Sequence, residues 1–140
     1  MALVLAVFSV AGRGQDVAAS ALKHIATTPY FAFGGVGYAG ITSQGETDFR
    51  VLITQPRAIA LQSFEKLYET GNGESKAYAL AGIRELNPGE FDQMLSSLLH
   101  STEKISTMEG CIVEQQSLAH VGANLKSGRY DYWIRRQPKR

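Results

Sequence analysis

Hydrophobic positions recur with helical spacing through the middle of the chain, where apolar residues stand three and four positions apart. This period is typical of amphipathic helices. The segments that show it cover residues 56–70, 74–86 and 88–99. The last has the clearest start, because Asn87 is a good N-cap, Pro88 suits the first turn and Glu90 completes the spacing of a capping box. We predict three consecutive helices, of which the second, rich in small residues, is the most buried.

Large apolar side chains on these three helices form the predicted core. They are Phe64, Leu80, Ile83, Phe91, Leu95 and Leu98. Residues of these types are the ones most often enclosed in protein interiors. We therefore expect all six to be nearly inaccessible to solvent.

Two further helices are predicted nearer the ends of the chain. Residues 14–27 carry an apolar face and stop before Pro29, since the residue before a proline avoids the helical region. Residues 114–126 also carry one, and Gly128 suits the C-terminal cap. Residues 44–53 fit a short helix or an extended segment. The pattern predicts an all-α fold, either HEAT-like stacked helical hairpins or an irregular four- to five-helix bundle.

A glycine-rich segment, residues 34–45, interrupts the helical pattern and is predicted to be a structured loop. Within it Gly35, Gly37 and Gly40 satisfy the G-x-G-x-x-G spacing of dinucleotide sites. Such a site needs a strand before the glycines and a helix directly after them. The residues after Gly40 start no clear helix, so a structural loop is favoured over nucleotide binding.

The N-terminus carries an apolar run, Ala2 to Ala11, broken only by Ser9. It is too short to span a bilayer as a helix. Small residues after it fit the rule for signal-peptide cleavage, although no Lys or Arg precedes it. We predict a signal peptide over residues 1–12, a single helical domain over 13–140, and export to the periplasm or medium. The alternative is an N-terminal helix or strand packed in the core of a cytoplasmic protein.

Composition and charge narrow the function classes. The chain has 140 residues, enough for one domain with its own core, and a formal net charge of +1. That charge argues against a strongly basic nucleic-acid binder. The single cysteine, Cys111, excludes an internal disulfide and is expected to be a small buried residue.

The three histidines are not spaced to hold a metal ion from one helix face. No catalytic, cofactor-binding or metal-ligating residue is expected. A small hydrolase that pairs Cys111 with His100 or His120 is the alternative.

Basic and aromatic residues alternate in the tail over residues 128–140. Together with an aromatic in the glycine-rich loop they supply the candidate partner-binding residues Tyr38, Arg129, Tyr130, Tyr132 and Trp133. Aromatics and arginines dominate the energetics of many interfaces. The competing interpretation is an ordered tail whose aromatics dock on the domain.

Two stretches resemble small exported bacterial proteins that have no assigned activity. They are residues 31–40 with 43–46, and residues 110–113 with 128–131. The resemblance implies a helical, HEAT-like domain outside the cytoplasm and transfers no site residues. We expect a non-enzymatic module that binds another protein. The alternatives are a small hydrolase or nucleotide-binding enzyme, and an immunity or inhibitor protein for a toxin.

Overall fold

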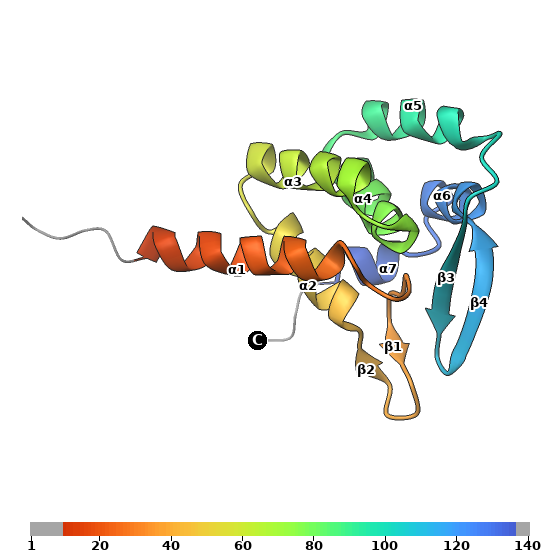
Figure 1. Cartoon of the computed structure of the whole chain (residues 1–140), viewed down its shortest axis with the longest axis horizontal. Helices are drawn as coiled ribbons and strands as arrows, with labels where there is room; N and C mark the ends of the chain where they lie inside the picture. The colour runs from red at the N-terminus through yellow and green to blue at the C-terminus, as the bar shows by residue number, and fades with distance from the viewer. Residues whose placement is uncertain (1–9, 137–140) are drawn as a thin grey trace, which may run out of the picture.

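The computed structural model describes residues 10–136, in which seven helices enclose one core and two antiparallel hairpins lie at one end (Figure 1). In chain order the elements are α1 (Val10–Ile25), β1 (Gly35–Val36), β2 (Ile41–Thr42), α2 (Gln44–Ile53), α3 (Arg57–Thr70), α4 (Gly73–Leu86), α5 (Pro88–Leu98), β3 (Lys104–Glu109), β4 (Ile112–Ser117), α6 (Leu118–Lys126) and α7 (Asp131–Ile134). The fold is mainly helical, as predicted. It is not all-α, because β1 pairs with β2 and β3 with β4. Within these residues no helix is long and apolar enough to cross a bilayer.

Helix α4 lies at the centre, and every residue from Ala77 to Ile83 is buried. This confirms the prediction for the small-residue helix. The cap of α5 is also confirmed, because the Asn87 side chain accepts from the Glu90 amide at 3.3 Å and donates to the Glu90 carboxylate at 3.1 Å. Asn87 follows the last residue of α4 and caps the first turn of α5, so the boundary between these helices is determined by local sequence.

Five of the six predicted core residues are buried, and the prediction for Leu95 is wrong. Leu95 is only half-buried and packs against the edge of the core. The reason is that α5 lies on the outside of the bundle and covers it with one side only. Its apolar stripe ends with the helix, and Leu99 just beyond is 70% exposed.

The helix predicted over residues 114–126 begins only at Leu118, where Ser117 caps it. The residues before it form β4, which pairs with β3 around a turn at Gly110. Gly110 has a φ of +58°, a conformation that favours glycine. The face of β3 toward the core carries two buried residues at alternate positions, Ile105 and Thr107.

The glycine-rich segment is a hairpin, with Gly37 and Gly40 at positive φ in the turn between β1 and β2. Residues 44–53, which the sequence left open, form α2. At the other end of the chain, the predicted cleavage point at residue 12 falls inside α1. Residues 1–9 of the predicted signal peptide lie outside the described range.

Candidate functional site

The side chain of Trp133 on α7 lies between two hollows in the surface. The larger, which we call the α2 hollow, has a volume of about 1160 Å³ and is lined by α2, the glycine-rich hairpin and residues 133–136. The smaller, the hairpin hollow, has a volume of about 400 Å³ and is lined by residues 31–33, both strands of the β3–β4 hairpin and Tyr130. Trp133 is thus where the tail and the two hairpins meet.

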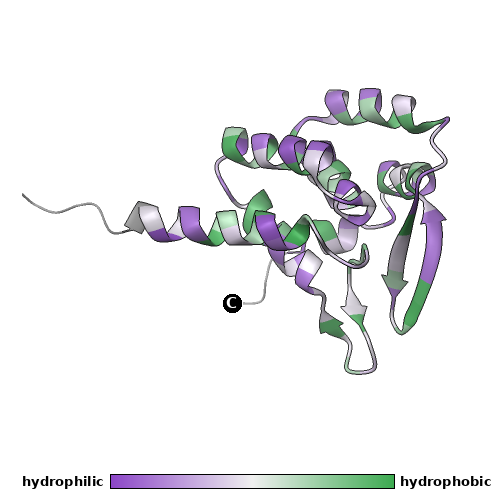
Figure 2. Cartoon of the chain, viewed as in Figure 1, coloured by the Kyte–Doolittle hydropathy of each residue, from purple (hydrophilic) through white to green (hydrophobic). Residues whose placement is uncertain are grey.

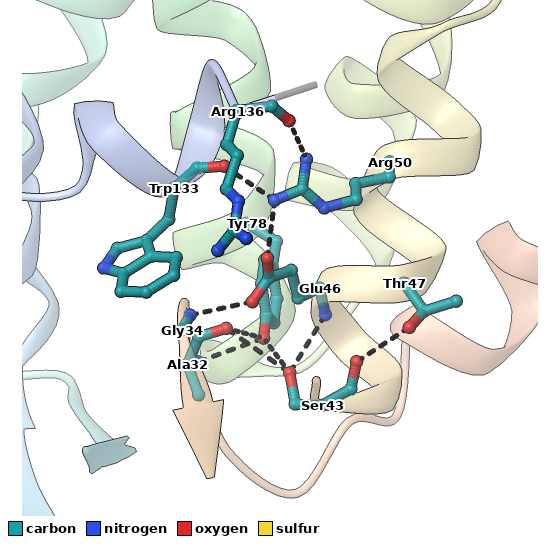
Figure 3. A network of polar contacts seen from close by, with 9 residues as sticks. All are labelled: Ala32, Gly34, Ser43, Glu46, Thr47, Arg50, Tyr78, Trp133 and Arg136. Carbon is teal, nitrogen blue, oxygen red and sulfur yellow. Dashed lines mark hydrogen bonds and ion pairs between the residues drawn. The ribbon is translucent and has the colours of Figure 1, made fainter. Parts of the chain in front are cut away.

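A buried carboxylate, that of Glu46, is among the groups that line the α2 hollow, and Figure 3 shows its polar contacts. Glu46, in the first turn of α2, accepts the Gly34 amide at 2.8 Å and the Arg50 guanidinium at 2.6 Å. Arg50 also donates to the main-chain oxygens of Trp133 at 2.7 Å and Arg136 at 2.8 Å. Because each carboxylate oxygen of Glu46 accepts a hydrogen bond, one from Gly34 and one from Arg50, the Glu46–Arg50 pair connects α2 to the hairpin and to the tail.

A second polar cluster lies beneath it, around Tyr78 of α4. The Tyr78 hydroxyl accepts the Ala32 amide at 3.0 Å and donates to the Ala32 carbonyl at 2.8 Å. Ser43, which also caps α2, lies 3.5 Å from the same hydroxyl. Burial raises the pKa of Tyr78 to about 12. The hydroxyl therefore holds the extended segment before β1 and is not poised for proton transfer near neutral pH.

The tail docks on the domain, as the competing interpretation expected. Tyr130 stacks edge-on against Phe31, with ring centroids 5.3 Å apart, and Ile134 is buried. The Trp133 ring packs on Gly34, where a Cβ atom would come within 3.0 Å of it. Tyr130 and Trp133 are half-buried, so most of their surface stabilises the domain.

Ion pairs hold the start of α7. Asp131 binds Arg84 of α4 at 2.5 Å, and the hydrogen bond from Arg84 holds the pKa of Asp131 below its usual value. Arg135 bridges to Glu85 at 3.2 Å. The Arg136 guanidinium lies over the Trp133 ring at 5.7 Å, in the geometry of a cation–π contact.

The other candidate partner-binding residues remain accessible, but they lie in different places. Tyr132 is 67% exposed on α7. Arg129 pairs with Glu109 at 3.0 Å at the rim of the hairpin hollow. Tyr38 is fully exposed in the turn of the β1–β2 hairpin. The structure therefore gathers Arg129, Tyr130 and Trp133 around one hollow and sets Tyr38 apart from them on a hairpin turn.

Residues that the sequence interpretation missed lie near Tyr38. The turns of the two hairpins are joined, because the Gly37 amide donates to the Gly110 carbonyl at 2.9 Å. Four exposed apolar side chains follow these turns or lie in them, namely Tyr38, Ile41, Ile112 and Val113. We call this set the hairpin end. The adjacent β-branched residues Ile112 and Val113, of a type that favours strands, were the available signal, and no element was predicted for them.

Catalytic chemistry has little support in this geometry. Cys111 is exposed in a turn, so the prediction of a buried thiol is wrong. Among the described residues no hydrogen bond or ion pair joins Cys111 to a histidine, and no cluster of three potential metal ligands forms. Gly35, Gly37 and Gly40 build a hairpin rather than the strand-to-helix turn of a dinucleotide site.

One buried carboxylate is incompletely satisfied. Asp48 of α2 accepts from Gln44 at 3.1 Å, and its Oδ1 lies 4.0 Å from Nδ1 of His24 on α1, while its Oδ2 has no partner among the described residues. Burial raises the pKa of Asp48, although Gln44 and His24 oppose the shift. The carboxylate sits at the contact of α1 with α2 and lines neither the α2 hollow nor the hairpin hollow.

Comparisons of the chain with protein-family models, curated proteins and solved structures give no match.

Proposed function

We propose that the protein is a non-enzymatic module that binds another protein through the hairpin end. The observation that carries this proposal is the exposure of its apolar side chains: Tyr38 is fully accessible, and Ile41, Ile112 and Val113 are 64%, 63% and 57% exposed. Two hairpins held together by a main-chain hydrogen bond present them from one end of the molecule. Ile112 and Val113 point to opposite faces of β4, so both faces of this hairpin are apolar near its turn. Exposed apolar groups concentrated at one end of a molecule are typical of protein–protein contact sites.

Rigidity supports the same conclusion. Both hairpins are anchored to the core, β1 through the Gly34–Glu46 contact and β3 through buried Ile105. A surface held in its bound shape loses less entropy on association. An immunity or inhibitor protein for a toxin would use the same surface. A hydrolase or nucleotide-binding enzyme is less well supported, because Cys111 is exposed in a turn and the glycines form a hairpin in place of a strand-to-helix turn.

Export and a HEAT-like arrangement belong to the same proposal. The packing of α3 against α4 and of α4 against α5 supports the proposal of a HEAT-like arrangement. The resemblance to small exported proteins and the apolar N-terminal run support a periplasmic or secreted location. Intact-mass spectrometry of the protein from its native host would detect a mature form that begins near Gly12 or Arg13.

Affinity capture with matched variants tests the binding role. Protein carrying Tyr38→Ser with Ile112→Ser should lose a partner that the wild-type protein captures from native extract. Ile59→Ser is the control, since Ile59 is an exposed apolar residue of α3, outside the hairpin end and 50% exposed. The expected result is one protein retained by wild type and control and lost by the double variant. Equal retention by all three, or no retained protein, would overturn the proposal.

A further inference from the structure

The two outer edges of the β3–β4 hairpin differ in how their main-chain groups are satisfied. On the β3 side, the Phe31 amide donates to the Ser106 carbonyl at 2.8 Å and the Met108 amide donates to the Phe31 carbonyl at 3.0 Å. The Ser106 amide donates to the Glu74 carboxylate at 2.8 Å. The edge of β3 is therefore covered by the rest of the protein.

The edge of β4 is open. In an antiparallel strand pair, two residues directly opposite one another either hydrogen-bond to each other through their main-chain amides and carbonyls, or both direct these groups away from the partner strand. Ser106 is opposite Gln115 and Met108 is opposite Val113, so the outward orientation of the first residue in each pair fixes that of the second. The amides and carbonyls of Val113 and Gln115 point away from β3, and no hydrogen bond to them from another part of the described chain is present.

Strand β4 also lacks the devices that normally protect such an edge. It contains no proline, lysine or arginine, and Glu114 is its one charged residue. In Figure 1 it forms the outer margin of the molecule, and Figure 2 shows its first residues as hydrophobic and its remainder as hydrophilic. The unpaired groups on this margin match the main chain of an extended peptide.

The side chains along β4 indicate what such a peptide carries. Glu109 and Glu114 share the face toward the hairpin hollow, because their opposite residues Ile112 and Thr107 lie on that face. Glu114 has no ion-pair partner among the described residues, and the Glu109–Arg129 pair is largely exposed. Val113 and Met108 lie side by side on the other face.

We propose that the edge of β4 takes up an extended segment of the partner protein as an added antiparallel strand. Basic side chains of that segment would lie beside Glu114 and apolar β-branched ones beside Val113. This inference rests on the proposed binding function and names its partner chemistry. Main-chain bonds to Val113 and Gln115 would supply affinity, and alternate side chains would supply specificity.

A second copy of the chain fits the edge less well. Pairing of two β4 strands about Glu114 sets that carboxylate directly against its copy. Like charges directly opposite one another destabilise a strand pair. If two β4 strands pair in another antiparallel register, Glu109 and Glu114 of both chains still lie on the same face of the joined sheet, which brings four carboxylates together. A basic segment removes this repulsion.

Fluorescence anisotropy with a labelled, capped Thr-Lys-Val-Lys-Val-Lys-Thr peptide tests the proposal on the full chain. Gln115→Pro removes the Gln115 side chain and one outward-pointing main-chain amide, at a place where an edge strand tolerates proline. We expect it to weaken binding at least about tenfold, whereas Gln115→Ala, which also removes the contact of this side chain with Ser106, should stay within about twofold of wild type. Glu114→Gln should weaken binding and reduce its salt dependence.

Peptide variants give a test that does not depend on folding of the protein. N-methylation of the two valine amides should abolish binding, because these residues face Val113 and Gln115 in the expected register. N-methylation of the two outer lysine amides should leave peptide binding unchanged, because those amides point away from β4. Equal binding of both methylated peptides, unchanged binding by Gln115→Pro, or no saturable binding by wild type would overturn strand addition.

Two outcomes separate this inference from the proposed function. If the peptide fails to bind while the hairpin-end variants still lose their native partner, strand addition is wrong and the binding role stands. If the native partner is retained by those variants, the proposed function fails, whatever the peptide does. A concentration-dependent dimer in sedimentation that Gln115→Pro dissociates would assign the edge to a second copy and overturn the basic partner.

Discussion

Phe64 of α3 fills the space beside Gly82 of α4 in which a Cβ atom would otherwise lie. Both residues are completely buried. The absence of a side chain at Gly82 lets the two helices approach closely, so the contact of α3 with α4 depends on this pair.

Gly82→Ala should lower the free energy of unfolding by about 1–3 kcal/mol, the usual cost of inserting a methyl group into a packed core. Alanine also favours a helix interior by about 1 kcal/mol relative to glycine, but the overlap of its methyl group with Phe64 should outweigh this gain. Gly89→Ala in α5 is the matched control, because its Cβ would meet nothing closer than 3.8 Å. Urea melts of both variants would show the difference, and equal stability would mean that the helices can separate without cost.

Tyr78→Phe should destabilise the protein by about 1–3 kcal/mol, because it removes the hydroxyl that pairs with the buried main chain of Ala32. A raised pKa in the folded state means that this group supports folding below its ordinary pKa near 10 and loses that support as the pH rises toward about 12. The variant should therefore lose less stability than wild type over this interval. Tyr132→Phe, a change on a side chain that is mostly exposed, serves as control in thermal melts across pH.

Leu98 and Leu99 are adjacent leucines with opposite environments. Leu98→Ala should cost about 2–5 kcal/mol, the range for large-to-small changes in a core. Leu99→Ala should change stability by less than about 0.5 kcal/mol, because that side chain is mostly in solvent. Similar losses for the two variants in urea unfolding would contradict the position of the end of α5.

Asp48→Asn should stabilise the protein at pH 7. Burial raises the pKa of Asp48, so the carboxyl favours folding while protonated and this contribution is lost as the pH rises through the folded pKa. The neutral amide avoids that loss and can still accept from Gln44. The advantage over wild type should shrink as the pH falls toward the pKa of Asp48, and a constant difference across pH would assign it to packing. Asp92→Asn, which removes an exposed ion pair with Lys126, is the control for the loss of one carboxylate charge.

Tyr132 and Trp133 are adjacent aromatics of α7, and we expect only Trp133 to stabilise the fold. Trp133→Ala should lower the melting temperature by several degrees, since the indole packs on Gly34 and walls both hollows. Tyr132→Ala should leave it nearly unchanged, because the side chain is mostly exposed. Scanning calorimetry of the two variants checks this. An equal drop in both would show that α7 docks through both aromatics.

The helices α3, α4 and α5 were predictable because their signals are local. Apolar periodicity and caps such as Asn87 act within a few residues of one another. The β3–β4 hairpin was missed because it buries only one short row, Ile105 and Thr107, and β4 is exposed along most of its length. A strand with so little burial shows no alternation of hydrophobic and polar residues.

The candidate site was predictable only in part, for a related reason. Exposed aromatics such as Tyr38 and Tyr132 can be expected on turns and termini. The Glu46–Arg50 network cannot, because Arg50 binds main-chain atoms of residues 83 and 86 positions away. Those carbonyls carry no residue-specific signal, so only the folded tail reveals them.

The position of Trp133 between the two hollows has a practical consequence, since this is the single tryptophan of the chain. Its emission is an intrinsic reporter for both cavities. A molecule that enters either hollow changes the surroundings of the indole, because Trp133 lines both. The wavelength of that emission, together with quenching by iodide, would register occupancy of either cavity in unlabelled protein.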